Sequence, residues 1–304
     1  MTRTHKYLIA IVSLGLLLGT AQAGPLRVTV LLAEEGVAYR EFALSFAVEA
    51  ERKNLPLSIS QADTLPPDTG LIVAVGIRSA TMALNSHAPV LNVLVSKAGF
   101  GKLLRDLPAH REKNTFSAIY LDQPSRRQVE LITSVLPEAK NIGLLFSAQL
   151  PEIASLRKAV AESRLVLHEQ KIGSADSLHR DLLALLQISD VLLAVPDAQI
   201  YNSSTMRNIL LSTYRSEVPV VGLSAPYVRA GALCAVFSTP DQIAAQAADM
   251  AGQFLATGRL PPAQYPIEFD VMVNRQVARS LGIQIKEPAA LIGQIKAASA
   301  GGAQ

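Results

Sequence analysis

Polar side chains follow two predicted strands in the second half of the chain, and their types suit hydrogen bonding rather than bond breaking. Asp197 comes just after the apolar run 191–195, and Ser224 follows the apolar run 218–221. The stretch between these runs, residues 203–214, has the spacing of an amphipathic helix. Buried apolar strands that alternate with helices are typical of a parallel sheet, whose ligands bind beyond the carboxyl ends of the strands. We therefore expect Asp197 and Ser224 to line a binding site for a small molecule.

Other polar residues occupy comparable positions. Arg78 follows the apolar run 71–75 and opens a predicted helix, where its guanidinium could hold a carboxylate or phosphate with two hydrogen bonds. The free amides of this helix start could add further donors. The alternative is a solvated arginine, although a cation at this end of a helix is slightly unfavourable. The expected ligand contacts are Arg78, Ser79, Ser96, Ser147, Asp197, Tyr201, Ser224 and Tyr227.

Each of these residues also has an ordinary structural explanation. Asp197 could cap the helix that follows it, and the serines could be turn residues at strand ends. Tyr201 and Tyr227 could offer a ring face and a hydroxyl to a ligand, or they could be ordinary half-buried tyrosines. Glu35 and Tyr39, which follow the first predicted strand, are weaker candidates.

The sequence lacks the residue patterns of the common enzyme classes. A nucleophile elbow would need a glycine two residues after Ser224, where Pro226 stands, and a histidine later in the chain, whereas all five histidines precede Ser224. No H-E-x-x-H, cysteine pair, G-x-G-x-x-G or G-x-x-x-x-G-K-[ST] pattern occurs. We predict no catalytic residue, no cofactor and no bound metal. An enzyme of unrecognised type would have to depend on Asp197 or Arg78.

Composition limits the possible partners. Of the 28 Lys and Arg residues, 2 lie within the first 23 positions, so that 26 basic residues face 25 acidic ones in the remainder, a net charge of +1. A nearly neutral chain lacks the positive field that phosphate backbones require, so nucleic acid is not expected as a partner. Cys234, the only cysteine, lies in an apolar run, which favours a buried small side chain over a reactive thiol.

The first 23 residues have the pattern of an export signal. A positive start at residues 3–6 precedes an apolar centre at 7–18 and an A-x-A cleavage site at 21–23. The alternative, a membrane anchor, would need about 20 apolar residues to span the bilayer. We therefore expect cleavage near Ala23 and a periplasmic protein without stable membrane insertion.

Predicted strands and helices alternate from residue 27 onward, as in α/β proteins. The 281 residues that follow the signal are enough to divide into two lobes. The predicted fold is α/β, with two Rossmann-like lobes whose parallel sheets are joined by a hinge of several strands, and hinge closure could clamp a ligand. The expected division is a signal peptide at 1–23, lobe 1 at 24–118 plus about 238–264, lobe 2 at 119–237 plus about 265–290, and a C-terminal tail at 291–304, disordered from residue 297.

Short segments between residues 121 and 285 match a known family pattern in order and spacing. They are Val195-Pro-Asp197, Val218-Pro-Val220, Tyr227-Val228 with Gly231-Ala-Leu233, Gly258 with Pro261, and Val273-Asn274 with Ala278 and Leu281-Gly-Ile283. This pattern resembles the periplasmic substrate-binding proteins of ABC transporters, in the family that includes tryptophan- and tyrosine-binding members. The resemblance implies a type I periplasmic-binding fold, reversible capture of a small polar solute, and a membrane permease with its ATPase as partner.

The amino-terminal half departs from this family pattern at positions expected to face the ligand. Residues 76–79 stand where the family has a Thr-Pro turn, residues 95–97 where it has Asp-Pro, and residues 147–149 where it has a loop containing Asn. The resemblance therefore does not bring an aromatic amino acid to this chain as its ligand. Arg78 favours a carboxylate-bearing, amino-acid-like solute. The departures leave a second function open, an envelope adaptor or sensor module with the same fold that acts through protein–protein contacts.

Overall fold

The computed structural model describes residues 27–60, 65, 69–108, 115–147 and 152–301. The expected export signal at residues 1–23 lies outside the described residues. Within the described ranges, none of the helices combines the length and apolar character that a membrane span requires.

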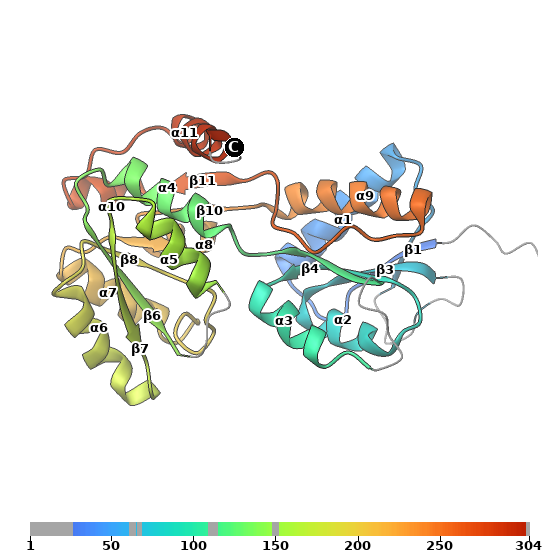
Figure 1. The fold of residues 1–304 in the computed structure, drawn as a ribbon, viewed down its shortest axis with the longest axis horizontal. Helices are drawn as coiled ribbons and strands as arrows, with labels where there is room; N and C mark the ends of the chain where they lie inside the picture. The colour runs from blue at the N-terminus through green and yellow to red at the C-terminus, as the bar shows by residue number, and fades with distance from the viewer. Residues whose placement is uncertain (1–26, 61–64, 66–68, 109–114, 148–151, 302–304) are drawn as a thin grey trace, which may run out of the picture.

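Lobe 1 is built on a sheet of five parallel strands in the order β2-β1-β3-β4-β5. The strands are β1 (Arg27–Leu31), β2 (Leu57–Ser60), β3 (Thr69–Val75), β4 (Val90–Val95) and β5 (Phe116–Tyr120). The helices are α1 (Val37–Arg52), α2 (Gly76–Met82), α3 (Lys97–Arg105) and α9 (Pro240–Thr257), with a short 3-10 turn η1 (Ala83–Asn85). Leu71 and Val73 of β3 pack with α1 and α9, whereas Ile72 and Ala74 pack with α2 and α3 (Figure 1). Because helices cover both faces, β3 is continuously apolar from Leu71 to Val75.

Lobe 2 is built on a sheet of six strands in the order β11-β10-β9-β8-β6-β7. The strands are β6 (Asn141–Phe146), β7 (Val166–Lys171), β8 (Val191–Leu193), β9 (Val220–Gly222), β10 (Cys234–Phe237) and β11 (Asp270–Val273). The helical segments are α4 (Ser125–Val135), α5 (Ile153–Ala161), η3 (Ala175–Ser177), α6 (Leu178–Leu186), α7 (Met206–Arg215), α8 (Ala225–Ala230), α10 (Arg275–Ser280) and α11 (Pro288–Gly301). All pairings are parallel except that of the edge strand β11 with β10. The prediction of an α/β fold with two parallel-sheet lobes is confirmed.

Three segments of the described chain cross between the lobes: residues 121–124, residues 238–239 and residues 265–268 (Figure 1). Hydrogen bonds join all three. The Gln123 amide donates to Ser238 Oγ at 3.0 Å, and the Ser238 hydroxyl donates to the carbonyl oxygen of Glu268 at 2.6 Å. The Arg127 guanidinium donates to Gln123 Oε1 at 2.6 Å and to the Pro266 carbonyl at 3.2 Å. The crossings therefore form one connected hinge.

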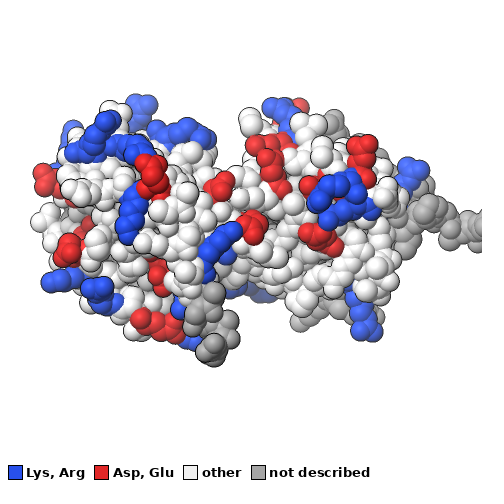
Figure 2. All heavy atoms as spheres, turned by 90° about the horizontal axis from the view of Figure 1, so that it is seen from above, with Lys and Arg blue, Asp and Glu red and all other residues white. Residues whose placement is uncertain are grey.

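This connectivity decides which edge of each sheet faces the other lobe. Strand β5 ends in the first crossing, and the other strands of lobe 1 run parallel to it. Strand β10 ends in the second crossing, and β6, β8 and β9 run parallel to it. The carboxyl ends of both sets of strands therefore lie on the sides that face each other. In the space-filling view the surface is notched between the two lobes (Figure 2).

Two segments differ from the sequence-based prediction. Residues 297–301, for which we predicted disorder, belong to α11, and Leu291 and Ile295 of this helix are fully buried in the core of lobe 2. These two apolar side chains dock a segment whose small-residue composition alone favours disorder. No helix was predicted at α8, which has six residues and carries Pro226 in its first turn, where a proline costs no hydrogen bond.

Gly76, at the junction of β3 and α2, provides a test of the lobe 1 backbone. Its φ is +78°, and an added Cβ would lie 2.8 Å from Glu34 Oε1 and 3.0 Å from Tyr39 Cζ. We expect Gly76→Ala to lower the free energy of unfolding by about 1–2 kcal/mol or more, because side chains disfavour this backbone region. Urea denaturation measures the change, with Gly173→Ala as control, since nothing lies within 4 Å of a Cβ there. Equal stability of the two variants would contradict the expectation.

Candidate ligand-binding site at the facing strand ends

The polar residues predicted at the ends of β6 and β8 contact each other. The Ser147 hydroxyl lies 2.8 Å and 2.7 Å from Asp197 Oδ1 and Oδ2, and the Ser147 backbone N–H donates to Oδ2 at 2.6 Å. The backbone N–H of Gln199 donates to Oδ1 at 3.0 Å. Asp197 does not cap α7, which begins at Met206 with Thr205 before it. Both Ser147 and Asp197 stay partly exposed on the edge of lobe 2 that faces lobe 1.

The two tyrosines predicted as contacts also lie together. The Tyr227 hydroxyl donates to the backbone carbonyl of Tyr201 at 3.0 Å. Tyr201 is buried, and its own hydroxyl has no hydrogen-bond partner among the described residues. Burial raises the pKa of Tyr201, and it also raises the pKa of Tyr227, which is only half-buried. Ser224 directly precedes α8, is partly exposed, and makes no capping hydrogen bond with its side chain.

In lobe 1 the three predicted contacts have different environments. Ser79 is fully buried, and its hydroxyl accepts a hydrogen bond of 2.9 Å from the backbone N–H of Ala33, which ties the end of β1 to α2. Ser96 caps α3 by accepting a hydrogen bond of 3.1 Å from the N–H of Gly99. Arg78 is exposed and makes no hydrogen bond or ion pair with any described residue. Of the three, Arg78 has its polar groups available to a ligand.

A residue that sequence reasoning passed over lies beside this turn. Glu34 follows β1, and one of its carboxylate oxygens, Oε1, is buried without a hydrogen-bond partner among the described residues. Burial and the neighbouring Glu34 carboxylate together raise the pKa of Tyr39. Glu35, the residue chosen from the sequence, is exposed. Glu34 and Glu35 are adjacent acidic residues after the same strand, and the sequence does not show which of the two side chains faces inward.

The hinge end of this region carries a second set of ionisable groups that the sequence did not indicate. Lys97 of α3 donates through Nζ to Tyr265 Oη at 2.9 Å, and its backbone N–H donates to Asp122 Oδ2 at 2.5 Å. Burial raises the pKa of Asp122 to about 6 and also raises the pKa of Glu152, which lies at the start of α5 in lobe 2. Lobe 1, the crossings and lobe 2 therefore each contribute a polar group here.

The arrangement offers hydrogen bonds and charge without a group placed for covalent chemistry. Among the described residues, no three His, Cys, Asp or Glu side chains are grouped to hold a metal ion. A cavity at the hinge, lined in part by Asp122, Glu152 and Pro196, has about 20 Å³, enough for about one water molecule. A solute at the facing strand ends would therefore be enclosed only when the lobes approach each other.

Comparison with known families identifies the class of protein. The family described as ABC transporter substrate binding protein matches residues 71–292. The chain therefore belongs to the ABC transporter substrate-binding protein family, which consists of non-catalytic binding proteins. The predicted resemblance and the prediction of a protein without enzymatic activity are both confirmed. Comparison with curated proteins gives no match.

Solved structures show the same fold at low sequence identity. The ligand-free, open structure of a substrate binding protein with adhesive properties from Clostridium difficile has a TM-score of 0.68 at 18% identity, covering 86% of this chain and 96% of that one. The ABC domain in complex with L-Trp from Streptococcus pneumonia has a TM-score of 0.63 at 15% identity, covering 88% and 98%. A periplasmic ribose ABC transporter protein from Conexibacter woesei has a TM-score of 0.53 at 12% identity, covering 89% and 98%. These similarities confirm the type I periplasmic-binding fold.

The buried Asp122 provides a test of the hinge. The folded protein keeps the Asp122 proton up to about pH 6, whereas the unfolded chain loses it near the ordinary pKa of 3.8. The folded state thus binds more protons between these values, and stability falls as the pH rises through this window. Asp122→Asn removes this loss. The free energy of unfolding of the variant minus that of the natural protein should therefore be higher at pH 7 than at pH 3.5, by up to about 3 kcal/mol. Urea denaturation at both pH values measures the difference.

The control for this experiment is Asp106→Asn, which changes an exposed aspartate that follows α3 in lobe 1, away from the crossings. Its stability relative to the natural protein should change much less between the two pH values. A difference between Asp122→Asn and the natural protein that stays constant with pH would show that the Asp122 carboxyl titrates normally.

Proposed function

We propose that the protein is exported to the periplasm and captures a small polar solute between its lobes, for delivery to a membrane permease with its ATPase. Family membership supports the binding role, and proteins of this family are typically extracytoplasmic. The proposal includes removal of the first 23 residues near Ala23. Two residues support solute capture: Arg78 is exposed after β3 of lobe 1, and Asp197 is partly exposed after β8 of lobe 2, so each follows a strand whose carboxyl end lies on the side of the other lobe.

The proposed ligand is an amino-acid-like solute that bears a carboxylate. The Arg78 guanidinium matches a carboxylate with two parallel hydrogen bonds. Asp197 receives three donors from the protein, the Ser147 N–H and O–H and the Gln199 N–H, whereas a carboxylate has about four acceptor positions. The remaining position can accept a hydrogen bond from a ligand ammonium or hydroxyl group.

Closure of the lobes is the step that would enclose the solute. Each half of the site is fixed before the ligand arrives, because Ser147 and Asp197 hold each other in lobe 2 and Ser79 holds Ala33 in lobe 1. The solute would therefore bind by bringing two preformed surfaces together through the hinge, without covalent change. An amino-acid ligand also agrees with the L-Trp bound to the structurally similar domain from Streptococcus pneumonia.

The thermal unfolding of the purified protein tests this function. We expect the unfolding temperature to rise with some amino acids or related carboxylates from a set that also contains other organic acids, nucleosides and vitamins, each at millimolar concentration. A ligand at 100 times its Kd stabilises the folded state by about 2.7 kcal/mol. No rise with any of these classes would overturn the proposal.

Variants of the two charged residues then test the site. Arg78→Gln should lower the affinity for the active ligand about ten-fold or more, because a hydrogen bond to a charged group contributes about 1.5–3 kcal/mol. Asp197→Asn should lower the affinity for ligands that carry an ammonium group and leave the affinity for other ligands unchanged. Isothermal titration calorimetry measures both changes, with Arg105→Gln, an exposed arginine at the end of α3, as control. Equal affinities for Arg78→Gln and the control would exclude Arg78 from the site.

A further inference from the structure

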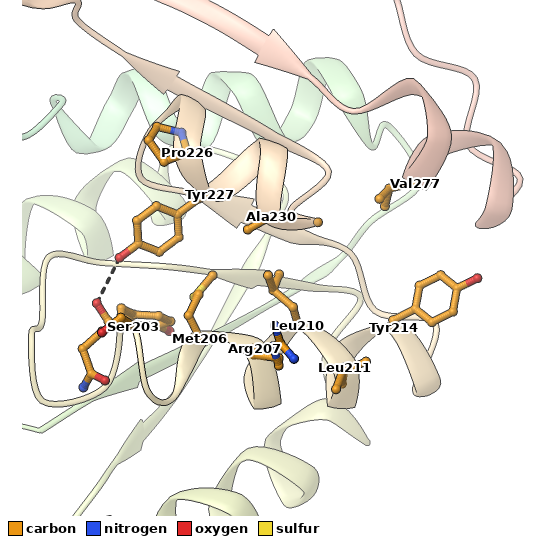
Figure 3. A pocket seen from close by; sticks show the side chains of 13 residues that line it. Ser203, Met206, Arg207, Leu210, Leu211, Tyr214, Pro226, Tyr227, Ala230 and Val277 are labelled. Atoms are coloured by element: carbon orange, nitrogen blue, oxygen red, sulfur yellow. Dashed lines mark hydrogen bonds between the residues drawn. The ribbon is translucent and has the colours of Figure 1, made fainter. Parts of the chain in front are cut away.

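A second concave surface lies on lobe 2, between α7 and α8 (Figure 3). This α7–α8 groove has a volume of about 770 Å³, and Val277 of α10 also contributes to its wall. Met206 and Leu210 of α7 face Tyr227 and Ala230 of α8 across it (Figure 3). All residues that line it belong to lobe 2, so the groove keeps its shape whether or not the lobes close.

The groove exists because α8 is too short to cover its neighbour. Six residues of helix extend about 9 Å, whereas the ten residues of α7 extend about 15 Å. The uncovered part of α7 leaves apolar side chains in contact with solvent: Leu211 is 49% exposed and Tyr214 is 53% exposed. Large apolar side chains grouped in a concave surface are typical of sites that bind another molecule.

The wall of the groove is held in place before any partner arrives. The Tyr227 hydroxyl donates a hydrogen bond of 3.0 Å to the Tyr201 carbonyl, which links α8 to the segment before α7. The Asn274 side-chain amide donates to the Val228 carbonyl at 2.9 Å, while its oxygen caps α10. Helices α8 and α10 are therefore linked, and a partner would not have to order them.

Charge on the surrounding helices is all of one sign. Helices α7, α8 and α10 contain no Asp or Glu. They contain the arginines Arg207, Arg215, Arg229, Arg275 and Arg279. Arg207 lines the groove itself. Arg275 pairs with Glu287, whereas the other four make no ion pair with a described residue.

We infer that the α7–α8 groove is a docking site for an acidic amphipathic helix of a partner protein. Apolar side chains at positions i, i+3, i+4 and i+7 of such a helix would fill the groove, and its Asp and Glu residues would pair with Arg207, the arginine that lines it. A second copy of this chain does not fit the same description. Two-fold symmetric pairing of the grooves would bring two copies of α7, α8 and α10 together, and none of these helices has an Asp or Glu to pair with Arg207.

Docking at this groove does not require solute capture, and it would serve either a transporter or a sensor. Tyr201 and Tyr227, which we predicted as ligand contacts, line the groove, whereas Arg78 and Asp197, on which the proposed solute site depends, do not. A solute-binding experiment and a docking experiment can therefore fail independently. The inference depends on the groove, on Arg207 and on the lack of Asp and Glu in α7, α8 and α10, and it extends the proposed function without relying on it.

A labelled peptide tests the inference directly. The probe is an 18-residue fluorescein-labelled helical peptide with Leu at i, i+3, i+4 and i+7 and Glu elsewhere. Its two controls are the same peptide with Lys in place of each Glu and a peptide of the same composition whose Leu residues are not on one face. We expect fluorescence anisotropy to show saturable binding of the acidic amphipathic peptide, with affinity at least about ten-fold higher than that of either control and falling with added salt.

Variants assign the binding to the groove. Leu211→Asp and Arg207→Glu, both at exposed positions, should each reduce the affinity at least about ten-fold. The matched controls are Ile188→Asp and Arg164→Glu, which change an exposed apolar and an exposed basic residue of lobe 2 outside the groove. Thermal unfolding of each variant checks that it is folded.

Four results would overturn the inference. The first is equal binding of the acidic and basic peptides, and the second is no binding of either at millimolar concentration. Another is an equal loss of affinity in the control variants Ile188→Asp and Arg164→Glu. The last is a dimer in sedimentation experiments that Leu211→Asp dissociates, because the groove would then be occupied by a second copy of this chain.

Discussion

The relation between the two lobes depends on a short chain of buried hydrogen bonds at the hinge. Gln123 and Ser238 are both almost completely buried, and together they connect the first crossing to the second and, through the Glu268 carbonyl, to the third. A buried amide or hydroxyl that loses its partner costs about 1–3 kcal/mol, so these groups favour keeping the crossings together during motion. Arg127 adds a guanidinium that packs 4.1 Å from the centre of the Phe269 ring, and its burial lowers its pKa to about 10. A change in the angle between the lobes therefore requires all three crossings to bend together.

The hinge determines which ends of the strands face the opposite lobe. Since β5 and β10 both run into crossings, the residues that follow the parallel strands of each sheet are set against the other lobe. Within each lobe, separate loops are also bonded to each other, Ala33 to Ser79 and Ser147 to Asp197. A solute would thus meet two surfaces whose internal geometry is already determined, and the remaining freedom is the angle between them.

The alternation of apolar runs with helices was sufficient to predict the two-lobed fold, because strands covered on both faces are recognisable as uninterrupted apolar segments. Short elements were harder. Helix α8 has too few residues to show a period, and α11 is docked by only Leu291 and Ile295 within a run of small residues. The partners of individual polar side chains were also out of reach. Ser147 and Asp197 are fifty positions apart, and their contact follows from the order β8-β6 in the sheet, which the sequence does not specify. Likewise, nothing in the sequence shows that Ser79 faces inward while the neighbouring Arg78 faces solvent.

The single cysteine has a practical consequence for studying the hinge. Cys234 lies in β10 with no exposed surface, and burial raises the pKa of its thiol to about 12, so it remains protonated and shielded from reagents at neutral pH. Maleimide dyes or spin labels would therefore attach to cysteines introduced on the two lobes and leave the native one untouched. The natural chain is ready for distance measurements between its halves in solution without any prior removal of a thiol.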